Sequence, residues 1–145
     1  MTKDELIEQV KYQARLIGVD PVLACAVAEQ ESNWDTWAIR YEPAFFTRYV
    51  ASQVNLSDTE RHARAFSWGV FQVMGQVARE RGYTGDFLSS LCQPENGIAI
   101  GVKFLKHLLD ISEGDEEKAL LRWNGGGRPE YATEVLARKL KYVNA

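Results

Sequence analysis

Apolar residues recur at helical spacing along most of this chain, separated by capping residues and by glycine or proline stops. In the longest example, residues 96–111, the apolar side chains at 98, 102, 105, 108 and 109 share one face. The same pattern predicts helices over 3–17, 21–33, 58–66, 75–82, 115–123 and 129–142. Strand signals are confined to residues 69–74. We therefore predict one mostly α domain over residues 1–145, with at most a short β segment.

The composition excludes several classes of function. The chain has 17 basic and 20 acidic side chains and a formal net charge of -3, whereas nucleic-acid binding usually requires a strong basic excess. No apolar run approaches the roughly 18 residues of a membrane span. Cys25, Cys92, His62 and His107 lack metal-ligand spacing. We expect no nucleic acid, membrane span, metal or cofactor, a buried free thiol at Cys25, and a monomer.

A glutamate at the end of an apolar helix is the first candidate for chemistry. Glu31 follows Val27 and Ala24 at helical spacing, so it continues their apolar stripe. A carboxyl group on the buried side of a helix has a raised pKa, which a general acid needs near neutral pH. Spacing alone leaves open that Glu31 merely reaches water at the helix end. Glu29 points about 160° away, and we expect it, like the basic side chains between 128 and 141, to face solvent.

Two further segments combine polar groups with bulky apolar residues. Within residues 67–74, Gly69 marks a close backbone approach, and Gln72 offers an amide that can bind a sugar hydroxyl or acetamide. The alternative is a core segment with one solvent-facing glutamine. Further along, Trp123 and Asn124 precede three glycines. They either border a cleft or belong to a simple helix cap and loop.

Taken in order, these segments resemble the soluble lytic transglycosylase domain, a relative of goose-type lysozyme. The matching motifs are Glu31-Ser32, Ser67-x-Gly-x-x-Gln-x-Met74, Trp123-Asn124-x-Gly126 and Tyr131-x-x-x-Val135-Leu136. The resemblance implies a lysozyme-like α fold with a glycan groove. It also implies cleavage of the β-1,4 bond between N-acetylmuramic acid and N-acetylglucosamine in peptidoglycan, with Glu31 as catalytic acid. The substrate-binding positions it implies are Ser32, Ser67, Gly69, Gln72, Val73, Met74, Trp123, Asn124 and Tyr131.

Two features depart from the family pattern. The family has a tyrosine where this chain has Trp123, and an indole N–H donates a hydrogen bond but cannot accept one. The segment between Glu31 and Ser67 is also longer than in most members. Within it, residues 40–46 resemble a segment of phage muramidases that carries an aromatic–glutamate pair. Glu42 is therefore the candidate for a second functional carboxylate, and the alternative is a solvent-exposed loop acid.

The sequence leaves three functions open. A lytic transglycosylase, which we favour, would use Glu31 alone, first as acid and then as base, and would form a 1,6-anhydro product. A hydrolytic, inverting muramidase would need a second carboxylate about 6.5–9.5 Å away to activate water. Glu42 is the first candidate for that carboxylate, followed by Asp35 and Asp58. The third function is a non-catalytic glycan-binding domain.

The place of action follows from the same interpretation. The first five residues lack the apolar core of a signal peptide, so we expect synthesis in the cytoplasm without a leader. The substrate lies in the cell wall, in the periplasm. A phage endolysin or virion enzyme, which we favour, fits both expectations, and the alternative is a domain of a larger secreted protein.

Overall fold

The predicted mostly α fold is confirmed in a computed structural model, which describes residues 1–143. Asn144 and Ala145 lie outside the described residues. The helices are α1 (Lys3–Ile17), α2 (Pro21–Ser32), α3 (Pro43–Phe45), α4 (Asp58–Ala63), α5 (Gly75–Glu80), α6 (Pro94–Ile111), α7 (Glu116–Trp123) and α8 (Tyr131–Arg138). Shorter turns of helix are the π-helical η1 (Phe46–Val50) and the 3-10 segments η2 (Leu88–Cys92) and η3 (Lys139–Tyr142). None of the helices in this part of the chain is long and apolar enough to cross a bilayer.

A small antiparallel sheet in the order β1-β2-β3 accompanies the helices. β1 (Ile39–Tyr41) pairs with β2 (Phe66–Trp68), with Ile39 opposite Trp68. β2 also pairs with β3 (Val73–Met74). The sequence predicted the β2–β3 ribbon only in part and missed β1. Three residues are too few to display the alternation that identifies a strand.

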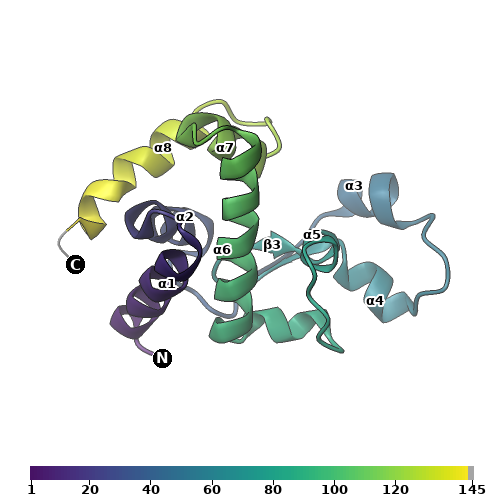
Figure 1. Cartoon of the computed structure of the whole chain (residues 1–145). Coiled ribbons are helices and arrows are strands. Elements are labelled where there is room, and N and C mark those ends of the chain that lie inside the picture. Colours follow the sequence, from purple (N-terminus) through teal and green to yellow (C-terminus); the bar gives the residue numbers. More distant parts are fainter. Residues whose placement is uncertain (144–145) are drawn as a thin grey trace.

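The long helix α6 stands at the centre of the molecule (Figure 1). α1 and α2 lie on one side of it, and α8 packs on α2. The sheet and α3, α4 and α5 lie on the other side. The predicted apolar face of α6 is buried at Ile98, Val102, Leu105 and Leu108. α6 therefore forms the core between two groups of elements: α1, α2 and α8 on one side, and the sheet with α3, α4 and α5 on the other.

Helix α2 is buried almost all round, and its sequence explains where it begins and ends. The side chain of Asp20 caps it by accepting the backbone N–H of Val22 at 2.9 Å. Residues 23–28 are fully buried, including the free thiol predicted at Cys25. The helix ends at Asn33, whose φ of 50° is left-handed, as is common at helix ends. The last turn of α2 therefore stops at a defined point beside the sheet.

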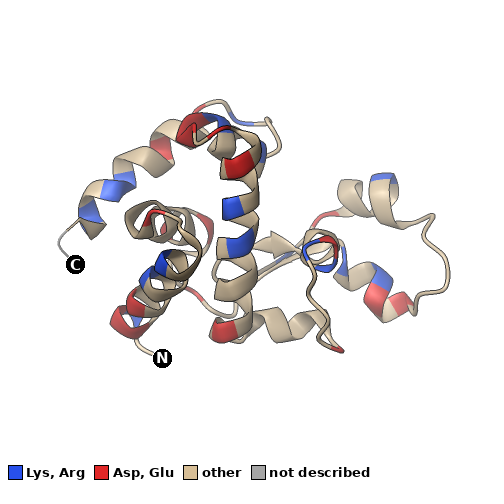
Figure 2. Ribbon diagram, in the orientation of Figure 1, with Lys and Arg blue, Asp and Glu red and all other residues tan. Residues whose placement is uncertain are grey.

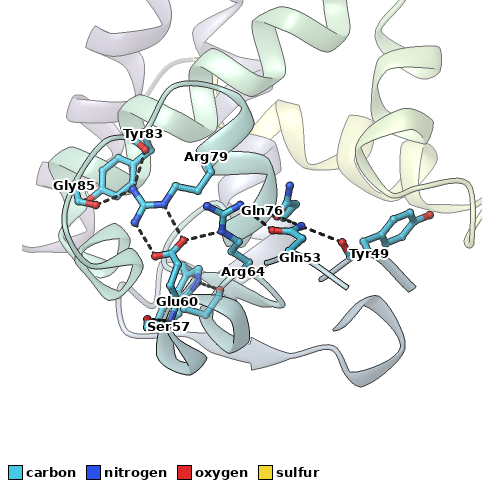
Figure 3. Close-up of polar contacts among 11 residues, drawn as sticks. Tyr49, Gln53, Ser57, Glu60, Arg64, Gln76, Arg79, Tyr83 and Gly85 are labelled. Atoms are coloured by element: carbon cyan, nitrogen blue, oxygen red, sulfur yellow. Dashed lines mark hydrogen bonds and ion pairs between the residues drawn. The ribbon is translucent and has the colours of Figure 1, made fainter. Parts of the chain in front are cut away.

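An ionic network holds together the elements opposite α2 (Figure 3). Glu60 of α4 accepts hydrogen bonds from Arg64 at 2.8 Å and from Nε and Nη2 of Arg79 at 3.0 and 2.9 Å. Burial opposes ionisation of Glu60, but the hydrogen bonds from Arg79 and Arg64 hold its pKa below the usual value. Arg64 also donates to Gln53 and Gln76. The network thereby links α4 and α5 to the chain that follows η1.

Candidate active site

A cleft of about 470 Å³ lies at the C-terminal end of α2. It brings together side chains from α2, all three strands, the β1–α3 junction, α3 and the end of α7. The sequence predicted most of this lining but gave no role to Arg40 or Phe45. The residues that line the cleft are Glu31, Arg40, Glu42, Phe45, Ser67, Gln72, Met74, Trp123 and Asn124.

Glu31 lies in the last turn of α2 and points into this cleft. The hydroxyl of Tyr131, itself 4% exposed, donates a hydrogen bond to Glu31 Oε2. Burial raises the pKa of Glu31, and the hydrogen bonds from Tyr131 and Trp123 offset only part of that effect. Burial and the adjacent carboxylate of Glu31 also raise the pKa of Tyr131, so the phenol remains a donor. Glu31 therefore has the environment of a carboxylic acid that keeps its proton to higher pH than an exposed glutamate does.

Trp123 supplies a donor at the position where the family has tyrosine. Its ring packs against Phe104 and Phe71, with centroid separations of 5.0 and 6.2 Å. Its hydrogen bond to Glu31 lowers the pKa of that carboxyl, as the bond from Tyr131 does. Because the carboxylate is the acceptor, the inability of an indole to accept a hydrogen bond has no consequence for this contact.

Gln72 uses most of its amide to hold the sheet together. Its Nε2 donates to the carbonyls of Ala38 at 2.8 Å and Gly69 at 2.9 Å, and its Oε1 accepts from Ser67 Oγ at 3.0 Å. Gln72 also has a left-handed φ of 51°, which is uncommon for a residue with a side chain. Its amide therefore lies on the cleft, but one acceptor position of Oε1 is all that remains for a ligand.

Arg40 and Glu42 face the cleft from the end of β1. They are two residues apart in extended backbone, so their side chains point to the same side. Arg40 Nε lies 3.0 Å from Glu42 Oε1. A second carboxylate thus shares the cleft with Glu31. The other two predicted alternatives, Asp35 and Asp58, are exposed and do not line it.

Four residues that the sequence placed at the site do not line this cleft: Ser32, Gly69, Val73 and Tyr131. Tyr131 lies behind Glu31, and the Ser32 hydroxyl donates back to the carbonyl of Ala28 at 3.2 Å. Gly69 allows a close approach, because a Cβ there would lie 2.6 Å from the carbonyl oxygen of Leu91. Val73 is 4% exposed and lines a smaller pocket that adjoins the cleft.

The expectation that Glu29 faces solvent is wrong. Glu29 is 5% exposed and accepts hydrogen bonds from Arg138, Lys141 and Tyr142. Figure 2 shows the basic residues of the C-terminal segment near its end, where these contacts form. Burial opposes ionisation, but the hydrogen bonds from Tyr142, Lys141 and Arg138 lower the pKa of Glu29 to about 2. Helical spacing gives the direction of a side chain but not what packs against it.

The solvated face predicted for the basic residues between 128 and 141 is wrong for Arg138 and Lys139, which are half-buried, whereas Arg128 and Lys141 are exposed as predicted. Arg138 and Lys141 bind Glu29, and Lys139 lies 3.0 Å from Glu116 and 3.3 Å from Asp20. The remaining one, Arg128, pairs with the exposed Glu130 and the half-buried Glu134 of its own segment. These charges serve mainly to attach the C-terminal segment to α2.

Comparison with known families assigns the chain. The model of the Transglycosylase SLT domain matches residues 8–142, which is nearly the whole sequence. The chain therefore belongs to the Transglycosylase SLT domain family, whose members are lytic transglycosylases that act on peptidoglycan. No curated protein and no solved structure matched. Across residues 1–143, no group of three or more histidine, cysteine, aspartate or glutamate side chains is placed to hold a metal ion.

Proposed function

We propose that this protein cleaves the β-1,4 bond between N-acetylmuramic acid and N-acetylglucosamine, with Glu31 as its single acid and base. The observation that carries the proposal is the environment of Glu31. Its carboxyl group opens into the cleft, its pKa is raised by burial, and it accepts a hydrogen bond from Tyr131. A single carboxyl group with a raised pKa suits a reaction in which the same group first gives and then takes a proton.

In the first step, protonated Glu31 donates its proton to the glycosidic oxygen while the bond from that oxygen to C1 of the muramoyl residue breaks. The muramoyl 2-acetamido oxygen bonds to C1 and forms an oxazolinium ion, as in substrate-assisted glycosidases. In the second step, the Glu31 carboxylate takes the proton of the C6 hydroxyl. The C6 oxygen then attacks C1, the bond between C1 and the acetamido oxygen breaks, and the 1,6-anhydro ring closes with the acetamido group restored. No water is consumed, and Glu31 ends protonated.

A hydrolytic muramidase is the second candidate, favoured by one observation. Glu42 lines the same cleft as Glu31 and has Arg40 as its ionic partner. A carboxylate placed across the sugar from the acid activates water in inverting glycosidases. In that reaction Glu42 would take a proton from water, and the oxygen of that water would attack C1.

The products of peptidoglycan digestion distinguish the two reactions. We expect mass spectrometry of the released fragments to show 1,6-anhydro muramoyl ends, which are lighter by one water (about 18 Da) than the reducing ends that hydrolysis leaves. We also expect Glu42→Gln to keep turnover within about tenfold of wild type, because water activation is not required. Reducing ends from the wild type, together with a loss of more than about 100-fold in Glu42→Gln, would establish the muramidase instead.

A further inference from the structure

The two ends of the C-terminal helical segment contact two glutamates of the same helix. Tyr131, at the start of α8, donates to Glu31, and Arg138, at its end, donates to Glu29. Seven residues correspond to about two helical turns, so Tyr131 and Arg138 lie on one face of α8. Val135, fully buried, lies between them on that face. This face packs against α2, which carries both glutamates (Figure 1).

Glu29 fixes the far end of this contact. Its buried carboxylate accepts hydrogen bonds from Arg138, from Lys141 at 2.9 Å and from Tyr142. The Tyr142 oxygen in turn accepts the indole N–H of Trp34 at 3.0 Å. Trp34 comes directly after Asn33, the residue that caps α2, and has a left-handed φ of 67°, a conformation that persists only where its surroundings hold it. One carboxylate thus joins the end of α2, the end of α8 and η3.

The loop that leads into the N-terminal end of α8 constrains the helix less than the contacts at its C-terminal end do. Residues 125–127 are three consecutive glycines, and a Cβ at any of them would meet nothing within 4 Å. Glycines restrict the backbone least, so these three residues by themselves do little to fix the orientation of α8. The position of Tyr131 is therefore set by the packing of α8 on α2 and α7 and by the contacts at its other end.

We propose that Glu29 is a positioning residue: by holding the end of α8 and η3 on α2, it keeps the Tyr131 hydroxyl on Glu31. Its catalytic consequence rests on the proposed role of Glu31 as acid. The contact itself does not, because it is a property of the folded chain. Glu29 touches neither the cleft nor the substrate and acts only through Tyr131.

The groups that face Glu31 come from three directions. Tyr131 of α8 and Trp123 of α7 donate hydrogen bonds to it. Arg40 and Glu42 face it across the cleft as an ion pair. Changing Glu29 alters none of these groups chemically, so any change at Glu31 reflects either position or the distant charge.

Position and charge shift the pKa of Glu31 in opposite directions when Glu29 is replaced by glutamine. The lost negative charge leaves Arg138 and Lys141 without their carboxylate, and this Coulombic change lowers the pKa of Glu31. A displaced Tyr131 removes a hydrogen bond from the ionised form of Glu31, which raises its pKa. The sign of the shift therefore separates positioning from simple electrostatics.

The test is a pH titration of the Glu31 carboxyl carbon by NMR, which requires no substrate. We expect Tyr131→Phe to raise the pKa of Glu31 by about one unit, since a hydrogen bond to a charged group is lost. We expect Glu29→Gln to raise it by about half as much. In the double variant the Tyr131 hydrogen bond is already absent, so only the Coulombic change remains and the pKa should lie slightly below that of Tyr131→Phe alone. In assays on peptidoglycan, the fall of kcat/KM at alkaline pH should move upward by the same amounts. If Glu31→Gln were active, the proposed function would fail while the titration still tested the contact.

Glu60→Gln is the matched control. Glu60 is, like Glu29, a carboxylate held by basic side chains, but it is only partly buried, and its two guanidinium partners belong to the network of Figure 3 rather than to α8. This variant should lower the melting temperature as Glu29→Gln does and leave the Glu31 titration unchanged. Tyr142→Phe removes one donor to Glu29 and should give a smaller upward shift. A downward or absent shift in both Glu29→Gln and Tyr142→Phe overturns the proposal.

Discussion

Glu31→Gln is expected to lower kcat/KM on purified peptidoglycan by at least about 10³-fold while leaving the protein folded. Glutamine has nearly the shape of glutamate, and its side chain can still lie beside Tyr131 and Trp123. It has no acidic proton for the glycosidic oxygen and no carboxylate to take the proton of the C6 hydroxyl. Because one group performs both transfers in the proposed reaction, both steps fail together. A turbidity assay on cell walls, with chromatography of the released fragments, measures the loss.

The same variant is expected to gain stability, with a dependence on pH that identifies the cause. The folded-state pKa of Glu31 is raised above the ordinary value of 4.5. The folded state therefore binds the proton more tightly than the unfolded state, and stability is lost as pH rises through the folded-state pKa. Glutamine never ionises, so the melting temperature of Glu31→Gln should exceed that of wild type at pH 8 and converge with it at pH 4. Such a stability gain accompanies the removal of many strained functional groups.

Glu117→Gln provides the control for the chemical change alone. Glu117 is exposed in the first turn of α7, the helix that ends at Trp123. Its replacement should leave both activity and melting temperature near wild type. If Glu31→Gln kept activity near that of Glu117→Gln, the acid would have to be another group, with Glu42 the first alternative because it shares the cleft.

The parts of the site that sequence predicted are those encoded locally. Helical spacing placed Glu31 on the inner stripe of α2, and the ordered motifs marked Gln72 and Trp123, which the structure brings to the same cleft. Capping residues such as Asp20 also marked helix ends correctly. Each of these signals lies within a few residues of the position it concerns, so one sequence suffices to detect it.

The parts that were missed depend on contacts between distant segments. Glu29 and Tyr142 are 113 residues apart. No residue near Glu29 in the sequence indicates that the C-terminal segment packs against its carboxylate. Arg40 became part of the cleft because β1 pairs with β2, opposite Ser67. The sequence identified Gln72 as a polar group in an apolar run. Its hydrogen bond to the carbonyl of Ala38, however, depends on how the α2–β1 loop folds back. Helical spacing cannot predict such contacts.

Phe71→Ala is expected to have the largest effect on stability, lowering the free energy of unfolding by about 3–5 kcal/mol. Phe71 is the largest of the fully buried side chains and lies between α6 and the cleft wall. Its ring meets the ring of Trp123 edge-on, with centroids 6.2 Å apart. Truncation would leave a cavity behind the residue that donates to Glu31. Urea denaturation measures the loss, and a cost under about 1 kcal/mol would mean that the surrounding side chains collapse into the space.

Gly101→Ala tests the same fit from the opposite side. A Cβ on Gly101 would lie 2.2 Å from Cγ and 2.5 Å from Cβ of Phe71, so α6 or the Phe71 segment would have to move. Alanine in place of glycine usually stabilises a helix interior by about 0.5–1 kcal/mol. Overpacking costs about 1–3 kcal/mol, which exceeds the gain in helix propensity, so we expect the variant to unfold at lower urea concentration.

Gly127→Ala, where a Cβ meets nothing within 4 Å, should change stability by less than about 0.5 kcal/mol. If adding one carbon at Gly101 and removing the ring of Phe71 both destabilise the protein, then the wall behind Trp123 is a tightly fitted contact. A stabilised Gly101→Ala would instead mean that the Phe71 side chain can move aside, and that Trp123 is held in place by Phe104 and α7 alone.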